Sequence, residues 1–266
     1  SFIFGKVIAA VAPSTGGEEW KALFRVFAIM IFIIMIVASF FFVRPGEDFQ
    51  PPAAKKEKKT REPAMDINTG AMVKQPSFWL MYVWAIFISA AGLALISQAS
   101  GIASQVGTGV ADGTIATVVG LISILNGIGR VIFGALYDKN GYKSTMILDM
   151  VSFIIAALIL ILALKSGNFA FIVLGFVVGG FAYGGVTPMQ SAFISDFFGR
   201  TYYSMNFSII VTNLLIGSFA STIAGKLYDA SGSYMSTIFM LIIVTVIAFV
   251  AFLGIRRPNG EKAATK

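Results

Sequence analysis

The sequence predicts an all-α membrane protein, and two properties of its composition support that fold class. Hydrophobic residues make up 57% of the 266 residues and charged residues only 12%, whereas soluble domains contain about 45–50% apolar and about 25% charged residues. The charged residues are also clustered, so that they leave apolar stretches of about 20 residues, the length of an α-helix that crosses a bilayer. This composition argues against a cytosolic enzyme, a secreted disulfide scaffold and a disordered regulator.

Seven apolar windows are long enough to be transmembrane helices. They cover approximately residues 20–43, 78–104, 114–137, 145–165, 168–195, 204–228 and 233–255. Residues 1–12 are apolar too, but they are too few to cross a membrane, and the chain begins with Ser1 instead of Met. We therefore expect residues 1–12 to be the end of an earlier span and the chain to be truncated at its N-terminus.

Basic residues in the loops predict the orientation, because Lys and Arg accumulate on the cytoplasmic side of a membrane. If the spans alternate, 14 of the 20 Lys and Arg residues fall on one side, in segments 44–77, 138–144 and 196–203 and in the C-terminal tail. Five fall on the other side, and Arg130 lies inside a span. We therefore expect a plasma-membrane protein whose segment 44–77 and C-terminus are cytoplasmic.

Segment 44–77 is predicted to be a linker. It separates an N-terminal part at 1–43 from a six-helix bundle at 78–256, which a tail at 257–266 follows. Five prolines and the run KKEKKTRE should leave the linker unable to bury apolar surface, so we expect a mobile cytoplasmic tether. A contact with lipid headgroups or with another protein is the alternative. Nucleic acid is not an expected partner, because the charge is mixed and the run contains no aromatic residue.

A short motif occurs twice, at the end of the span at 114–137 and at the end of the span at 204–228. The copies are Gly134-Ala-Leu-Tyr-Asp138-Lys-Asn-Gly141-Tyr142 and Gly225-Lys-Leu-Tyr-Asp229-Ala-Ser-Gly232-Ser-Tyr234. Since three spans separate the copies, they should lie on opposite faces of the membrane. Residues 78–165 and 168–255 then form two three-helix units of inverted topology, an arrangement typical of secondary transporters. Chance similarity of a short motif is the alternative.

On these residues the chain resembles the major facilitator superfamily. Segment 134–143 is similar to the family's cytoplasmic signature, Gly-x-x-x-Asp-Arg/Lys-x-Gly-Arg/Lys-Arg/Lys, with Tyr142 in place of one basic residue. The resemblance implies that residues 78–255 are the last six helices of an alternating-access transporter in a lipid bilayer. It also implies that 1–12 and 20–43 are the fifth and sixth helices, and that the missing N-terminal helices are a partner of this part.

A narrower resemblance is to the oxalate/formate antiporter family of small-carboxylate carriers. The segments that carry it are Asn126-Gly-Ile-Gly-Arg130, Asp196-Phe-Phe-Gly199 and the second copy of the repeated motif. The oxalate carrier has a lysine that partners the arginine, whereas the matching region here is Val211-Thr212-Asn213-Leu214. With one cation, the resemblance implies a small organic anion as substrate, and favours a monocarboxylate such as formate, lactate or pyruvate over a dicarboxylate.

Arg130 is the strongest candidate for binding this substrate. A charged residue deep in a span costs about 2.5–3.5 kcal/mol to insert, and such residues usually face an aqueous cavity and carry function. The planar guanidinium can hold a carboxylate through two parallel hydrogen bonds. Ser123 and Asn126 share a helix face with Arg130, at spacing i, i+3, i+7. The alternatives are snorkelling to the inner interface and a structural pair with a carboxylate.

Two further spans supply candidates for the same site. Tyr183, Thr187 and Gln190 share one face of the span at 168–195, and Thr212 and Asn213 lie in the span at 204–228. Glycines in these regions predict close helix packing instead. They form one stripe at Gly113, Gly120, Gly127 and Gly134, and a second set at Gly175, Gly179, Gly180 and Gly184.

Gly134, Asp138, Lys139, Gly141 and Lys143 are the predicted gating residues. They lie at the expected cytoplasmic end of a span, where charges can hold one face of a carrier closed and release it when the two halves rock.

Carboxylates are expected only near the ends of the spans, including Asp149, which the sequence places about one turn inside the span at 145–165. A proton relay at the midplane is therefore not expected in this part of the chain. Either exchange of one anion for another drives transport, or the relay lies in the missing helices.

The chain contains neither Cys nor His, so disulfides, thiolate chemistry and the commonest metal ligand are excluded. Since it also lacks a paired carboxylate and a phosphate-binding loop, we expect no enzyme activity, cofactor or metal. A carrier of an unrelated substrate is one alternative function. A seven-span receptor or channel is another, although no filter-like ring or series of pore-lining charges is present.

Overall fold

The computed structural model describes residues 19–43 and 63–258, and all regular secondary structure in these ranges is helical. The chain divides into two compact units, Ser1–Lys59 and Thr60–Lys266. In the first unit, α2 covers Glu19–Ser39, and its apolar part, Phe24–Ser39, is shorter than the other predicted spans. The predicted span at 20–43 is thus a helix that ends at Ser39, and the expectation for residues 1–12 lies outside the described residues.

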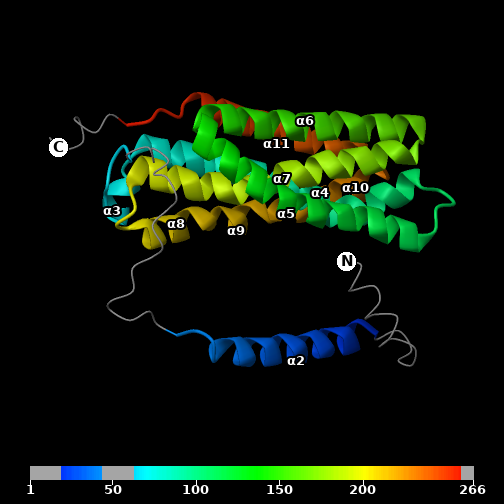
Figure 1. Ribbon diagram of the computed structural model, residues 1–266. Helices are drawn as coiled ribbons and strands as arrows, with labels where there is room; N and C mark the ends of the chain where they lie inside the picture. The colour runs from blue at the N-terminus through cyan, green and yellow to red at the C-terminus, as the bar shows by residue number, and fades with distance from the viewer. Residues whose placement is uncertain (1–18, 44–62, 259–266) are drawn as a thin grey trace. The chain divides into compact units, whose positions relative to one another are not determined.

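The second unit contains six helices that are long and apolar enough to cross a membrane. They are α4 (Pro76–Val106), α5 (Asp112–Asn140), α6 (Tyr142–Ser166), α7 (Phe169–Phe198), the broken helix α8–α10 (Tyr203–Ser231) and α11 (Met235–Leu253). These helices lie side by side along their lengths (Figure 1). The prediction of an all-α bundle at 78–256 is confirmed for this part of the chain.

The helix boundaries follow from local sequence signals. Pro76 occupies the first turn of α4, where its missing N–H costs nothing. The Asn168 side chain accepts a 2.9 Å hydrogen bond from the backbone N–H of Ala170 and caps the start of α7. Helices α5 and α10 each end at a glycine with positive φ, Gly141 at 77° and Gly232 at 66°, a conformation that glycine adopts without steric cost.

These two glycines also belong to the two copies of the repeated motif. The copy that ends at Gly141 closes α5, and the copy that ends at Gly232 closes α10 (Phe219–Ser231). The two closing turns lie at opposite ends of the bundle (Figure 1). This placement agrees with the predicted inverted repeat.

Glycines of α7 bring three neighbouring helices close to it. Added Cβ atoms at Gly175, Gly179 and Gly180 would collide with Leu160 of α6, Leu95 of α4 and Ile122 of α5, respectively. At Gly184 a Cβ would meet the backbone of α5 and would lie 3.0 Å from the backbone nitrogen of Arg130. The prediction of close packing through the glycines of this helix is confirmed.

The glycine stripe predicted on α5 is wrong at the positions that can be compared. Among the described residues, a Cβ at Gly113 or Gly127 would meet nothing within 4 Å, and at Gly134 it would meet only Pro188, at 3.8 Å. Gly129 instead approaches α7, where an added Cβ would collide with the Phe181 carbonyl oxygen. A seven-residue spacing identifies one helix face, but it does not determine which face a neighbour covers.

The predicted span at 204–228 is a helix in three pieces. They are α8 (Tyr203–Val211), α9 (Asn213–Gly217) and α10, with interruptions at Thr212 and Ser218. The Thr212 hydroxyl donates to the Ile209 carbonyl at 2.6 Å, and the Asn213 amide donates to the Ile210 carbonyl. Such side-chain bonds compete with the backbone hydrogen bonds of the helix and bend it.

Part of the predicted linker packs onto the bundle. The backbone N–H groups of Ala64 and Ile67 donate to the carbonyls of Asp196 and Phe198 at 2.8 and 3.1 Å. Met72, in the short helix α3 (Thr69–Met72), is fully buried. The expectation of a linker without buried apolar surface is therefore wrong for residues 63–77, because Met side chains and backbone pairing fix this part. Residues 44–62 lie outside the described part.

Candidate functional site

Arg130 lies on α5 with its side chain exposed, about two turns before Asp138. Its Nε donates a 3.2 Å hydrogen bond to Oδ1 of Asn126, one turn earlier on the same helix. No carboxylate within residues 63–258 forms an ion pair with it. The Asn126 bond orients the guanidinium and leaves its two terminal nitrogens available to an anion.

The contact between α5 and α7 fixes the backbone that carries Arg130. Gly129 and Gly184 face each other, and an added Cβ at Gly184 would lie 2.9 Å from the Gly129 Cα. Because both neighbours are backbone atoms, neither helix can move closer or rotate without a collision. The position of the Arg130 Cα is therefore determined by direct helix contact.

Tyr183 lies beside this contact on α7 and is partly buried. Its ring covers Gly92 of α4, where a side chain would overlap it. Tyr183 directly precedes Gly184, whose contact with α5 involves the backbone of Asn126 and Arg130. Thr187 follows Tyr183 by one turn and is exposed. The structure thus gathers Asn126, Arg130 and Tyr183 around the α5–α7 contact, with Thr187 one turn further along α7.

Asn213 does not join this group. It is fully buried, and its amide donates to Oε1 of Gln190 at 3.2 Å while its Oδ1 accepts from the Ser89 hydroxyl at 2.9 Å. The three side chains form a polar network between α4, α7 and α9. Gln190 is buried as well, so the face predicted from Tyr183, Thr187 and Gln190 divides into an exposed part and a packed part.

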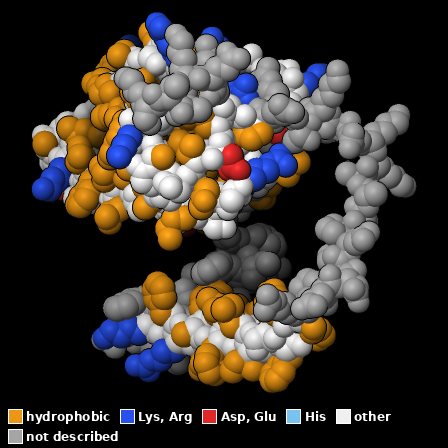
Figure 2. Space-filling model, turned by 90° about the vertical axis from the view of Figure 1, so that its left-hand side faces the viewer, with side chains coloured by type: hydrophobic (Ala, Val, Ile, Leu, Met, Phe, Trp, Pro, Cys, Tyr) orange, Lys and Arg blue, Asp and Glu red, His pale blue; other side chains and the backbone are white. Residues whose placement is uncertain are grey.

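One end of the bundle, called the Asp138 end below, contains the turn at Gly141, the turn at 199–202 and residues 255–258. Figure 2 looks onto this end, where Lys and Arg side chains are spread around the edge with few acidic side chains between them. The predicted gating residues all lie here, and Lys139 and Lys143 are exposed.

Four of these gating residues line two separate cavities. Gly134 and Asp138 line a cavity of about 500 Å³ together with Arg200 of the 199–202 turn. The other lining residues are Pro188, Ser191, Ala192, Ser195 and Tyr203. Hydroxyl groups in this cavity are already bonded, since Ser191 Oγ and Tyr203 Oη lie 2.7 Å apart and Arg200 Nε donates to Ser195 Oγ at 3.2 Å.

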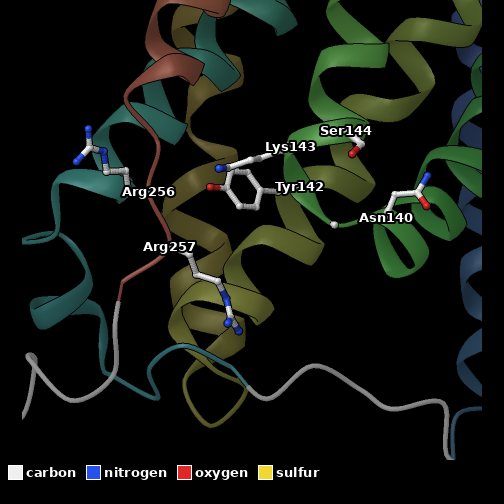
Figure 3. A pocket seen from close by; sticks show the side chains of 7 residues that line it. Asn140, Tyr142, Lys143, Ser144, Arg256 and Arg257 are labelled. Carbon is white, nitrogen blue, oxygen red and sulfur yellow. The ribbon is translucent and has the colours of Figure 1, made fainter.

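Gly141 and Lys143 line the second cavity, of about 560 Å³, with Arg256 and Arg257 (Figure 3). The two arginine side chains point in different directions (Figure 3), so their charges do not converge on one point. Arg257 forms an ion pair with Asp196 at the end of α7, at 2.9 Å. The cavity therefore lies beside the ion pair that attaches the chain after α11 to α7, and it is not a preformed anion site.

Sequence reasoning missed the environment of Asp149. The structure places this carboxylate in α6 with no exposed surface and no hydrogen-bond partner for either oxygen among the described residues. The signal was the presence of a carboxylate inside an apolar helix, but the helix face that Asp149 occupies could not be derived from sequence. No group of three or more His, Cys, Asp or Glu residues that could hold a metal occurs within the described ranges.

Comparison with known proteins places these features in a family. The family model described as Major Facilitator Superfamily matches residues 1–222. The chain is 26% identical to the Oxalate:formate antiporter of Oxalobacter formigenes over 236 residues, which are 88% of this chain and 53% of that protein. It is also 26% identical to the Uncharacterized MFS-type transporter YhjX of Escherichia coli (strain K12) over 175 residues, 65% of this chain and 43% of that protein.

The chain thus spans about half the length of these curated relatives. The six apolar helices are those that the resemblance implied for residues 78–255, and the family model covers most of the residues that form them. The chain belongs to the Major Facilitator Superfamily, a family of integral membrane transporters rather than enzymes.

Proposed function

We propose that the protein is a secondary transporter of small organic anions, which carries a monocarboxylate such as formate, lactate or pyruvate by alternating access. The observation that carries the proposal is Arg130, an exposed arginine within a membrane span that no carboxylate of the described residues neutralises. Placing such a charge in a span costs about 2.5–3.5 kcal/mol. Charged residues that persist in spans despite this cost usually have a function, such as binding a ligand.

The surroundings of Arg130 support binding of a carboxylate. Asn126 holds Nε, so the two terminal nitrogens can donate parallel hydrogen bonds to the two oxygens of one carboxylate. Tyr183 can donate a further hydrogen bond from its hydroxyl, and Thr187 extends the polar surface by one turn. Asn213 contributes indirectly, because its buried network positions α7 against α9.

The number of cations supports a monoanion over a dianion. Within the six spans of the second unit, Arg130 is the only Lys or Arg away from a helix end, since Lys139, Lys143, Lys165 and Lys226 lie near helix ends. Leu214 is partly exposed at the position where the resemblance to the oxalate carrier leads one to expect a second cation. A second carboxylate would then lack a charged partner. Oxalate and formate are the substrates named for one relative.

The Asp138 end is proposed to face the cytoplasm of a plasma-membrane protein. Lys and Arg side chains surround this end (Figure 2). In membrane proteins these residues accumulate on the cytoplasmic side. In this orientation the cavity that Gly134 and Asp138 line opens on the cytoplasmic side. Charges of Asp138, Lys139 and Lys143 would then regulate opening of that side.

Uptake of radiolabelled formate by proteoliposomes tests the proposal, with the full product of the gene as the protein. Unlabelled formate, lactate, pyruvate and oxalate are added in turn as competitors. We expect the three monocarboxylates to compete better than oxalate. If none of these anions competes and formate is not taken up, the protein carries an unrelated substrate and the proposal is wrong.

A further inference from the structure

Asp149 is a fully buried carboxylate. It is the eighth residue of α6, about 10 Å from the start of that helix. Its side chain has no exposed surface, and neither Oδ1 nor Oδ2 has a hydrogen-bond partner in the described part of the chain. Buried polar groups in native proteins are nearly always hydrogen-bonded, so a carboxylate with two unpartnered oxygens calls for a specific explanation.

The residues of α5 and α7 that are shown near Asp149 are apolar. Gly185 of α7 lies against it, and an added Cβ there would be 2.8 Å from Asp149 Oδ1 and 2.6 Å from the ring of Phe133. Phe133 of α5 is fully buried, and its ring lies 5.0 Å from that of Phe181 at a tilt of 43°. Phe153, one turn further along α6, is buried as well. The carboxylate therefore lies near Gly185 and the Phe133 ring.

None of the charged residues on the helices that pack on α6 pairs with Asp149. The titratable or charged residues of these helices are Asp112, Arg130, Tyr137, Asp138 and Lys139 on α5, Tyr183 and Asp196 on α7, and Tyr82 on α4, while α11 has none. On α6 itself they are Tyr142, Lys143 and Lys165. None of them forms a hydrogen bond or an ion pair with Asp149. An ionised carboxylate without a partner is not tolerated in such a place, and the group takes up a proton instead.

Two adjacent glycines of α7 connect this carboxylate to Arg130. Gly184 touches the α5 backbone at Arg130, and Gly185 touches Asp149. A rotation or shift of α7 that changes one contact must change the other, because packed helices move as rigid elements. Anion binding at Arg130 and enclosure of Asp149 are thus linked through a single turn of α7.

We infer that Asp149 is a proton-binding site, and that the carrier moves its anion together with this proton. The inference rests on the proposed function and specifies its coupling ion. In the conformation described here, Asp149 holds the proton as a neutral carboxyl group. When α7 moves and water reaches the site, the O–H bond breaks, the proton passes to water and the electron pair stays on the carboxylate. After the empty carrier has returned, the group takes up a new proton from the side where the next anion binds, so that one proton crosses the membrane with each anion.

Infrared spectroscopy of the purified protein in lipid tests the protonated state directly. We expect the C=O band of a neutral carboxyl group at pH 7, and we expect Asp149→Asn to remove it. Asp112→Asn is the matched control, since Asp112 is an exposed carboxylate in the first turn of α5, and it should leave the band unchanged. A band that is absent from the parent protein, or that survives in Asp149→Asn, would overturn the assignment.

Two transport modes test the coupling. In proteoliposomes, Asp149→Asn should still exchange internal for external formate, because the amide resembles the protonated carboxyl group. It should lose uptake that an imposed pH gradient drives, whereas Asp112→Asn should keep both modes. Gradient-driven uptake that persists in Asp149→Asn overturns the coupling. If the parent protein does not bind formate at all, the proposed function is wrong, and the infrared band still decides whether Asp149 holds a proton.

Discussion

The two sides of α7 place an ionisable side chain in opposite environments. On the α5 side Arg130 is exposed and held by Asn126, whereas on the α6 side Asp149 is enclosed and has no hydrogen-bond partner in the described part. Gly184 and Gly185, adjacent in sequence, form the two contacts. Under the proposed function, this difference divides the roles: the open side receives the anion and the closed side holds the proton.

The largest effect is expected on the open side. Arg130→Gln should abolish formate uptake, since loss of a charged hydrogen-bonding partner costs about 2–5 kcal/mol, roughly 30-fold to several thousandfold in affinity. Arg130→Lys should keep weak uptake, because lysine retains the charge but not the planar pair of donors. Uptake kinetics in proteoliposomes measure both variants. Lys165→Gln, which removes an exposed charge at the end of α6, is the control, and normal formate binding by Arg130→Gln would show that the arginine is structural.

Replacing Gly184 or Gly185 with alanine compares the α5 side of α7 with its α6 side. Gly184→Ala meets backbone atoms of α5 that cannot yield, whereas Gly185→Ala meets the side chains of Phe133 and Asp149, which can shift. Overpacking of a core costs about 1–3 kcal/mol, and we expect Gly184→Ala to lie at the upper end of that range and Gly185→Ala at the lower.

Thermal unfolding in detergent measures these costs, and Gly127→Ala is the matched control. A Cβ at Gly127 would meet nothing within 4 Å, so this variant should be neutral or up to about 1 kcal/mol more stable because alanine favours the helix. Equal melting temperatures for Gly184→Ala and Gly127→Ala would contradict the close contact between α5 and α7.

These comparisons also show what sequence could and could not predict. Helices and their ends follow from apolar length, Pro76, Asn168 and Gly141, which act locally. Asp149 and Asn213 could not be assigned, since their roles depend on which helix covers each face. The packed segment at 63–77 was missed because the prolines and charges of residues 44–62 dominate the composition of the predicted linker and conceal Met65 and Met72.

A second cation near Arg130 should change which anion the open side prefers. Leu214→Lys places a positive charge at a partly exposed position of α9, and it should shift preference toward dicarboxylates by up to about tenfold, equivalent to 1.4 kcal/mol. Competition of oxalate against labelled formate measures the change. Leu215→Lys, at the more exposed neighbouring position, is the control for added charge alone, and an equal shift in both variants would show that Leu214 does not face the anion.

Asp138 tests whether the cavity near the end of α5 regulates opening. Asp138→Asn should lower the transport rate several-fold with little change in substrate affinity, because the residue lines the cavity with Gly134 and Arg200 about two turns from Arg130. The maximal rate and the half-saturating formate concentration are measured together. Loss of binding with normal turnover would instead assign Asp138 to the anion site.

The smallest effect is expected at the ion pair between Asp196 and Arg257, where α7 meets the chain after α11. The pair is short, at 2.9 Å, but 35% of the Arg257 side chain is exposed, and solvent-exposed pairs contribute about 0.2–1 kcal/mol. A double-mutant cycle of Asp196→Asn and Arg257→Gln, followed by thermal unfolding, isolates the pairwise energy from the other contacts of each residue. A coupling energy in this range would mean that the pair fastens the chain without controlling transport. A larger coupling together with a changed transport rate would make the end of α7 a second point of control, because movement of α7 at Gly184 and Gly185 would then be restrained from the Asp138 end.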